Sequence, residues 1–286
     1  MTEKSETTIE KIGTITGKTG TTLLANADTS RWDIWGKILE DVLEDQGELY
    51  VFSDTETTGT ELIDDSSKTF NRVLEWSLCF CRRNTMGLYE PILDKKGNPV
   101  VIDEPINPFI ETQVTKKQQQ SIDYIPAGSL RIHGITQDYL FGDEDGEGGR
   151  TKLPRQAGTI DVFYYELMKL LNISSYLRGA KPIYIVFHNA AFDIKFLNQE
   201  MEMIQKPPVE SYFIPCDTLT QAKKILDKSM VENHTLDTVY KYGLTHYPEH
   251  IKAMDRPIHT SLLDSLILIE VYNTLLLASG KVLPSD

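Results

Sequence analysis

An apolar run, LYVF at residues 49–52, is followed directly by acidic residues in the sequence SDTETTG. The run predicts a buried strand whose end carries Asp54 and Glu56. Side chains two residues apart on a strand point to the same face, so these two carboxylates can converge on one point. Buried carboxylates are unfavourable unless a cation meets them. The segment is therefore either a cation site or, as the commoner alternative, an exposed strand end with a turn at TTG.

A further acidic residue, Asp193, follows a second apolar segment. The sequence KPIYIVFHN predicts a short buried strand that ends at His188 and Asn189, and AAFDIKFLNQEM predicts the helix after it. Asp193 falls in the first turn of that helix, where the helix dipole alone favours a carboxylate. The same position lies beyond the carboxyl end of a strand, where α/β sheets place their binding sites.

The third acidic segment is RPIHTSLLDSLILIEVY, which contains His259 and Asp264. Five residues on one helix are about 140° apart, so these two side chains cannot share a helical face. If the helix begins near Thr260 or Ser261, His259 lies on the preceding loop and Asp264 projects from the first turns. The alternative is a capping box formed by Ser261 and Asp264, with His259 on the surface.

Taken together, the three segments predict a metal-dependent phosphodiesterase site. Four carboxylates can bind two divalent cations about 4 Å apart, which suits in-line displacement at phosphorus. A histidine that titrates near neutrality can take the proton of the attacking water. The predicted metal ligands are Asp54, Glu56, Asp193 and Asp264, with His259 as the general base.

Composition narrows the function classes. The 286 residues are 40% hydrophobic and 25% charged, enough for a substantial core, and the net charge of -13 excludes a broad basic surface that coats nucleic acid. A nuclease remains compatible, because a site that collects cations must itself be acidic. No apolar run approaches the roughly 20 residues that span a bilayer, and the N-terminus lacks a secretory signal. We expect a cytoplasmic protein without membrane contact.

The order of elements predicts an α/β fold with a mixed central sheet flanked by helices. Residues 1–29 have no periodicity and are expected to be a flexible extension, and residues 30–286 one folded domain that begins with an amphipathic helix, SRWDIWGKILEDVLED. Three segments predict strands of an antiparallel meander: ELYVFSDTE, NRVLEWSLCFCRRN and GLYEPILDKKGNPVVI, the last with a turn at KKGN. The segment FGDEDGEGGR predicts a surface loop, and four helices are expected after residue 158 besides the one that carries Asp193.

With these residues in hand, the chain resembles the DEDDh family of 3'-5' exonucleases, and within it the epsilon proofreading subunits of bacterial DNA polymerase III. The resemblance runs from about Leu49 to Leu277. It rests on DTETTG, HNAAFD and HTSLLD, and also on NRVLEWSL, INPFIE, RIHGIT and CDTLTQAKKIL, in the family's order.

The resemblance implies a ribonuclease H-like fold. The exonuclease domain is expected over residues 30–286, although the leading helix that begins at Ser30 has no counterpart in the family. It implies magnesium or manganese as the two divalent ions, and release of nucleoside monophosphates from 3' ends. The same four carboxylates would bind the metal, with His259 as base. The positions expected to contact the terminal nucleotide or shape its pocket are Thr55, Thr57, Thr58, His133 and Asn189.

The sequence also departs from the family. Thr60 stands where relatives often carry an apolar wedge against the terminal base, and Leu62 is expected to take that role. The chain ends at GKVLPSD without the long tail by which the epsilon subunit holds its polymerase, so a freestanding nuclease and a polymerase partner stay open. DNA with single-stranded or frayed 3' ends is the expected substrate. The alternatives are an exoribonuclease or oligoribonuclease, and a non-catalytic nucleic-acid-binding module.

Overall fold

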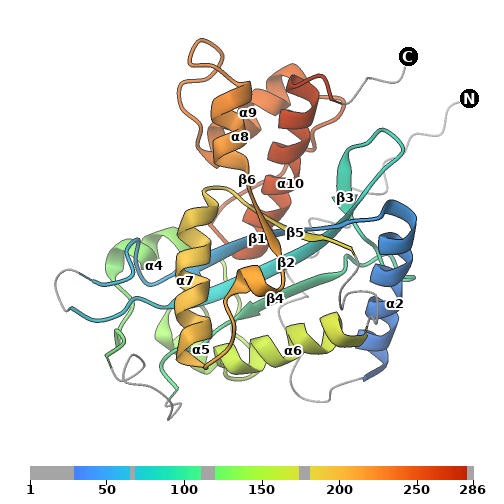
Figure 1. Cartoon of the computed structure of the whole chain (residues 1–286). Helices are drawn as coiled ribbons and strands as arrows, with labels where there is room; N and C mark the ends of the chain where they lie inside the picture. Colours follow the sequence, from blue (N-terminus) through green and yellow to red (C-terminus); the bar gives the residue numbers. More distant parts are fainter. Residues whose placement is uncertain (1–28, 65–67, 111–119, 174–180, 282–286) are drawn as a thin grey trace, which may run out of the picture.

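The computed structural model of the chain describes residues 29–64, 68–110, 120–173 and 181–281 (Figure 1). The expected N-terminal extension lies outside these residues except for Thr29, so its flexibility stays a prediction. The amphipathic helix that follows it is present as α2 (Thr29–Gln46).

A six-stranded mixed sheet forms the centre of the described chain, in the order β3-β2-β1-β5-β6, with β4 also paired to β2. Strand β1 lies in the middle, antiparallel to β2 and parallel to β5, and β5 is parallel to β6. The strands are β1 (Leu49–Thr57), β2 (Val73–Arg83), β3 (Tyr89–Pro91), β4 (Val101–Pro105), β5 (Ile183–Phe187) and β6 (Ile214–Asp217). This confirms the predicted fold class.

Helices cover both faces of the sheet. One hydrophobic core joins the sheet to α2, α6 and α7, and a second core joins the other face to α8, α9 and α10. The alternation along β1 separates them, since Val51 belongs to the first core and Phe52 to the second. The helices are α4 (Ala127–His133), α5 (Gln137–Phe141), α6 (Ile160–Ile173), α7 (Ala190–Met203), α8 (Thr218–Ile225), α9 (Leu236–His246) and α10 (Ser261–Ala278), with a 3-10 turn η3 at Val209–Ser211.

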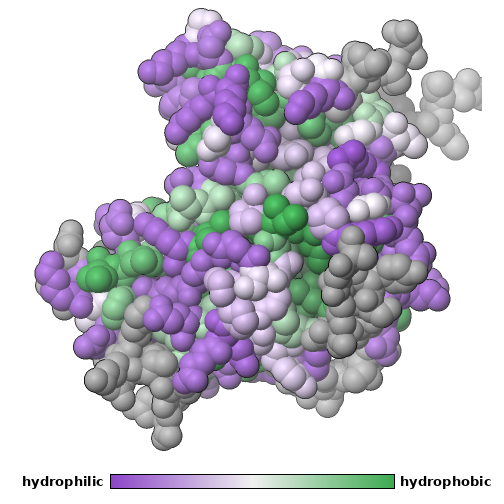
Figure 2. Space-filling view, viewed as in Figure 1, coloured by the Kyte–Doolittle hydropathy of each residue, from purple (hydrophilic) through white to green (hydrophobic). Residues whose placement is uncertain are grey.

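Helix α10 is the most apolar helix of the described chain. It is long and apolar enough to cross a membrane by length and composition, but 78% of it is buried inside the fold. Its side chains contact β1, β2 and α9, so it serves as a core helix here. Hydrophilic side chains cover most of the surface on the side seen in Figure 2.

The predicted third strand is interrupted at the turn that was expected at KKGN. The segment GLYEPILDKKGNPVVI forms two strands, β3 and β4, which pair with different parts of β2. They are separated by a turn in which the Asp94 carboxylate accepts the backbone N–H groups of Lys96 and Asn98 and Gly97 adopts φ +80°. Strand β6 and helices α4 and α5 were not predicted, because each is too short for a hydrophobic period to show.

Trp76 fixes β2 against α6, one of the helices that pack in the first hydrophobic core. Its ring is fully buried, stacks on Phe163 of α6 at 4.6 Å between centroids, and donates an indole hydrogen bond to Ser53 Oγ on β1 at 2.9 Å. The residue therefore ties together β1, β2 and α6.

We expect Trp76→Ala to lower the free energy of unfolding by about 3–5 kcal/mol, because a large cavity opens and a buried hydroxyl loses its donor. Urea denaturation would measure the loss. Tyr165→Ala, which removes an aromatic side chain from a residue that is 60% exposed, is the control. A loss below about 1 kcal/mol for Trp76→Ala would contradict the assignment.

Candidate active site

The first two acids lie on β1 and point to the face that α10 covers. Phe52, two residues earlier on the strand, packs in the core shared with α10, so Asp54 and Glu56 continue the same face. Glu56 is 7% exposed. The ladder with β2 shifts register between Glu56 and Thr57, so regular pairing ends immediately after the second acid. The strand thus places both carboxylates at the end of its regular pairing with β2.

Asp193 approaches from the opposite side of β1. It lies in the first turn of α7 and is buried, and its Oδ1 accepts a hydrogen bond from the Thr55 hydroxyl at 2.8 Å. The Thr55 side chain points away from the face of Asp54 and Glu56, so this bond fixes Asp193 at the same point along β1, where its charge acts on Asp54.

The last pair comes from the start of α10. Thr260 is the N-cap residue, with its hydroxyl accepting the Leu263 N–H, and Asp264 lies in the first turn. His259 therefore lies on the loop before the helix, as predicted from the spacing. Its Nδ1 is 3.0 Å from Asp264 Oδ2, and its side chain is 42% exposed.

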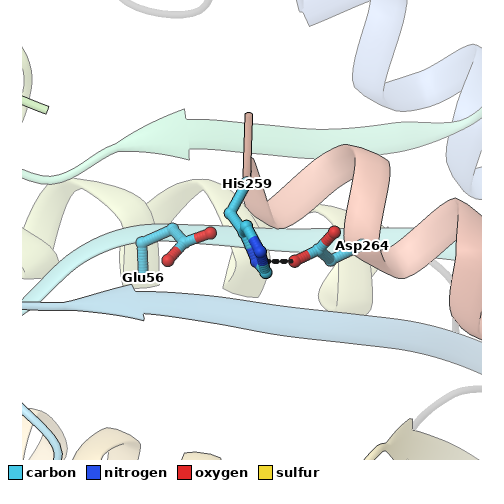
Figure 3. Close-up of side chains that lie close together, drawn as sticks. All are labelled: Glu56, His259 and Asp264. Atoms are coloured by element: carbon cyan, nitrogen blue, oxygen red, sulfur yellow. Dashed lines mark hydrogen bonds and ion pairs between the residues drawn. The ribbon is translucent and has the colours of Figure 1, made fainter. Parts of the chain in front are cut away.

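These side chains converge. In Figure 3 the His259 ring stands between the carboxylates of Glu56 and Asp264, and one ligand atom from each of the three lies within 4.8 Å of the others. Burial raises the pKa of Asp54, and the nearby charges of Asp264, Asp193 and Glu56 raise it further. All four acids from three distant segments therefore share one electrostatic site.

The electrostatics of the cluster suit a divalent cation. Burial, followed by the charges of Glu75 and Asp264, raises the pKa of Glu56. Burial also raises the pKa of Asp193 to about 7. Glu56 Oε1 and Asp264 Oδ1 are buried and have no hydrogen-bond partner. Hard oxygen ligands with unmet acceptor capacity are what magnesium and manganese bind. The four carboxylates could therefore hold such ions.

Sequence reasoning missed Arg256, which lies three residues before His259. Its Nη2 donates to Asp264 Oδ2 at 2.6 Å, and its Nε is 2.6 Å from Asp264 Oδ1, although the angle there does not make a hydrogen bond. It also pairs with Asp237 of α9. The arginine partly neutralises the cluster, because its charge lowers the pKa values of Asp54 and Glu56 against the larger upward effects. The signal was present in the sequence as a cation beside the third acidic segment.

Arg256 and Asp264 compete for one nitrogen of His259. Arg256 Nη2 lies 2.6 Å from Nδ1, and Asp264 Oδ2 lies 3.0 Å from it. A guanidinium can only donate and a carboxylate can only accept, so a protonated Nδ1 bonds Asp264 whereas a bare Nδ1 bonds Arg256. The tautomer of the candidate base is thus linked to the ionic partner of Asp264.

A second missed residue, Asp217, holds the segment that carries Asp193. Its Oδ1 accepts the N–H groups of Asn189 at 2.9 Å and Ala190 at 3.3 Å, and it also caps α8. These bonds support the left-handed conformation of Asn189, φ 73°, at the start of α7. The family-like segment CDTLTQAKKIL contained this residue, but its partner could not be identified without the fold.

The residues predicted to contact substrate occupy varied positions. Asn189 is exposed beside the α7 start, while Leu62 is half-buried and packs on the core that contains α6 and α7. The Thr57 hydroxyl bonds Gly59 O. Thr55, Thr57, Thr58 and His133 are all buried. Thr58 donates to Asn71 Oδ1, and His133 Nδ1 accepts the Ile135 N–H. Their contacts with a nucleotide stay predictions.

Comparison with known proteins supports the resemblance. No protein-family model matches the chain. The DNA polymerase III subunit epsilon of Buchnera aphidicola subsp. Acyrthosiphon pisum (strain APS) is 27% identical over 158 residues, covering 55% of this chain and 52% of that protein. The Escherichia coli (strain K12) subunit epsilon is 32% identical over 143 residues, covering 49% and 46%. The chain spans about half the length of the curated relatives it matches.

A solved structure extends the likeness over most of the fold. The nuclease domain of 3'hExo, a DEDDh family member solved with rAMP bound, superimposes with a TM-score of 0.50 at 12% identity, covering 84% of this chain and 96% of that one. The resemblance to the DEDDh exonucleases is confirmed. So is the ribonuclease H-like fold, with the acidic cluster at the end of its central strand.

The raised pKa of Asp193 predicts how stability depends on pH. In the unfolded chain this carboxyl has its ordinary pKa of 3.8, and in the fold the pKa is about 7. The folded state therefore holds a proton that the unfolded state has released, so stability falls as pH rises from about 4 to about 7. We expect Asp193→Asn to make the metal-free protein lose less stability over this range. Urea denaturation with a chelator at several pH values would measure it, and an equal loss in both proteins would contradict the assignment.

The contacts of Arg256 predict that it competes with a bound cation. We expect Arg256→Met to bind Mn²⁺ about tenfold more tightly, because a charge-assisted bond to Asp264 of about 1.5 kcal/mol no longer has to break. Calorimetry would measure the affinity. Arg82→Met is the matched control, since it removes the same charge from a side chain that is 51% exposed and paired with Glu90. Equal Mn²⁺ affinity in the two variants would show that Arg256 acts only through net charge.

Proposed function

We propose that the chain is a metal-dependent 3'-5' exonuclease that releases nucleoside monophosphates from DNA 3' ends. The observation that carries the proposal is the convergence of Glu56, His259 and Asp264 from two distant segments, with two buried carboxylate oxygens left without hydrogen bonds. The effect of the Asp264, Asp193 and Glu56 charges on Asp54 supports adding the other two acids to this site. The confirmed resemblance supports the reaction class. The choice of DNA is supported by the names of the curated relatives, which are DNA polymerase subunits.

The proposed cofactor is a pair of Mg²⁺ or Mn²⁺ ions held by Asp54, Glu56, Asp193 and Asp264. Bound there, the ions would stabilise charge on both the attacking and the leaving oxygen of the phosphodiester. The Thr55 hydroxyl keeps Asp193 in place for this role.

His259 would act as the general base. When its Nδ1–H donates to Asp264, the ring is oriented and Nε2 is the bare nitrogen that can accept a proton; the tautomer that bonds Arg256 carries its proton on Nε2 and cannot act as the base. With 42% of its side chain exposed, the ring is accessible to water and to a substrate end. The proton of the attacking water would pass to Nε2 and then to solvent.

The proposed substrate is a single-stranded or frayed 3' end, with Thr55, Thr57, Thr58, Leu62, His133 and Asn189 contacting the terminal nucleotide or shaping its pocket. Association with a polymerase and a cytoplasmic location are further proposals, suggested by the relatives. RNA is the second candidate substrate, because family members differ in this respect through 2'-hydroxyl contacts that the motifs do not specify.

An activity assay with strands labelled at the 5' end tests the proposal. We expect a ladder that shortens from the 3' end of DNA with Mg²⁺ or Mn²⁺ present and none with a chelator. An RNA strand of the same sequence in parallel would identify an exoribonuclease by faster shortening. Binding without shortening under every metal condition would instead identify a non-catalytic module.

Two variants test the residue roles in that assay. Asp54→Ala should abolish turnover and leave the fold intact, because it removes one charge from a repulsive cluster; Asp41→Ala, exposed on α2, is the control. His259→Ala should lower the rate about 100-fold to 10,000-fold, as expected for a positioned base. Full activity in Asp54→Ala would refute the metal site, and a full rate in His259→Ala would move the base to another residue.

A further inference from the structure

The acidic, glycine-rich segment predicted as a surface loop, residues 141–150, ends in a buried arginine. Most of the segment is exposed, as expected, but the Arg150 side chain is only 6% exposed. It reaches inward beneath the loop that carries His259. A buried guanidinium is unfavourable unless its donors are paired, so its partners indicate what the segment is for.

Arg150 bonds three groups around the candidate base. Its Nη1 and Nη2 donate to the two carboxylate oxygens of Glu75 at 2.7 and 3.0 Å. Its Nε donates to His133 O at 2.5 Å, and Nη2 also donates to His259 O at 3.2 Å. One planar side chain therefore connects β2, the end of α4 and the backbone of His259.

Glu75 completes the connection on the other side. Its Oε2 accepts the N–H of Ser261, the first residue of α10, at 2.8 Å. Burial raises the pKa of Glu75, but the charge and hydrogen bonds of Arg150 and the Ser261 N–H outweigh it, so the net pKa is below the usual value and the group is ionised. The pair thus holds the chain on both sides of Thr260.

Glycines let the segment pack directly on the base loop. Gly148 has φ +67°, and a Cβ there would overlap the Cδ1 atom of Ile258, the residue before His259. Glu147 N donates to Gly134 O at 2.8 Å, and a Cβ on Gly134 would in turn collide with Glu147 O. The loop and the end of α4 therefore meet without intervening side chains.

We propose that Arg150 and Glu75 are positioning residues that hold His259 in place for catalysis. The inference rests on the proposed function of His259 as the base. The His259 ring is 42% exposed, and its only side-chain hydrogen bonds among the described residues are the two alternative contacts of Nδ1, so its placement depends on the backbone. That backbone is fixed by the His259 N–H on Ile132 O at 3.4 Å, by Arg150 on the carbonyl, and by Glu75 on Ser261.

The chain offers a matched control for this pair. Arg72 and Glu200 form a second buried bidentate pair, with Nε–Oε1 and Nη2–Oε2 distances of 2.8 Å each. Glu200 also accepts the Val73 N–H, so this pair joins the start of β2 to α7. It matches Arg150 and Glu75 in chemistry and burial, but none of its hydrogen bonds involves residues 256–261.

A double-mutant cycle tests the proposal by single-turnover cleavage of 5'-labelled DNA. Arg150→Lys keeps the charge and loses the planar, bidentate geometry. We expect it to lower the rate about 10-fold to 100-fold in the wild-type background, as expected for a misplaced base. In the His259→Ala background the same substitution should change the rate less than about twofold, because the group it positions is gone. Arg72→Lys should change the cleavage rate by the same factor in both backgrounds.

The outcomes separate this inference from the proposed function. An inactive wild-type protein, or full activity in His259→Ala, refutes the proposed function itself. An active wild type, a weakened His259→Ala and an equal Arg150→Lys factor in both backgrounds refute only the positioning role. If Arg150→Lys does not fold, the neutral double substitution Glu75→Gln with Arg150→Gln replaces it, and the same dependence on His259 decides.

Discussion

The structure depends on holding like charges together out of water. The charges of Glu56, Asp193 and Asp264 repel the Asp54 carboxylate, and burial adds a desolvation penalty for Asp54, Glu56 and Asp193. Such a cluster persists only if the elements that carry it are rigid. The central strand, the first turn of α7 and the first turn of α10 meet that requirement, since each is anchored in a hydrophobic core on at least one side. The large buried helix α10 is therefore a support for Asp264 as much as a core element.

Two arginines balance the acids in different ways. Arg256 contacts Asp264 directly and is partly exposed, with 14% of its side chain accessible, so a cation or a phosphate could change its partner. Arg150 is enclosed and bonds Glu75, which is not one of the four proposed metal ligands, together with two backbone carbonyls. A buried pair of this kind adds little net stability over an apolar pair of the same shape. Its value lies in the orientation it imposes on the chain.

The sequence predicted what depends on local pattern. The periods of two and 3.6 residues identified the strands and helices that carry the acids, and the spacing of His259 and Asp264 placed the start of α10 correctly. Contacts between residues far apart in the sequence could not be predicted from it. Arg150 meets Glu75 across 75 positions, and Asp217 supports Asn189 across 28. Arg150 looked like an ordinary loop residue, Glu75 like a strand residue and Asp217 like the start of a helix, because their roles exist only once the fold brings their partners close.

The same limit explains why Arg256 escaped notice although Asp264 is only eight positions away. The loop before α10 folds Arg256 back onto Asp264 in the first turn of the helix. Sequence spacing alone does not determine the path of that loop. Once this contact has formed, His259 Nδ1 lies within hydrogen-bond distance of a donor, Arg256 Nη2, and of an acceptor, Asp264 Oδ2. Weakening the bond of Asp264 to that nitrogen favours the bare form that Arg256 can bond. The position of the proton on the His259 ring is therefore coupled to the cation that Asp264 contacts.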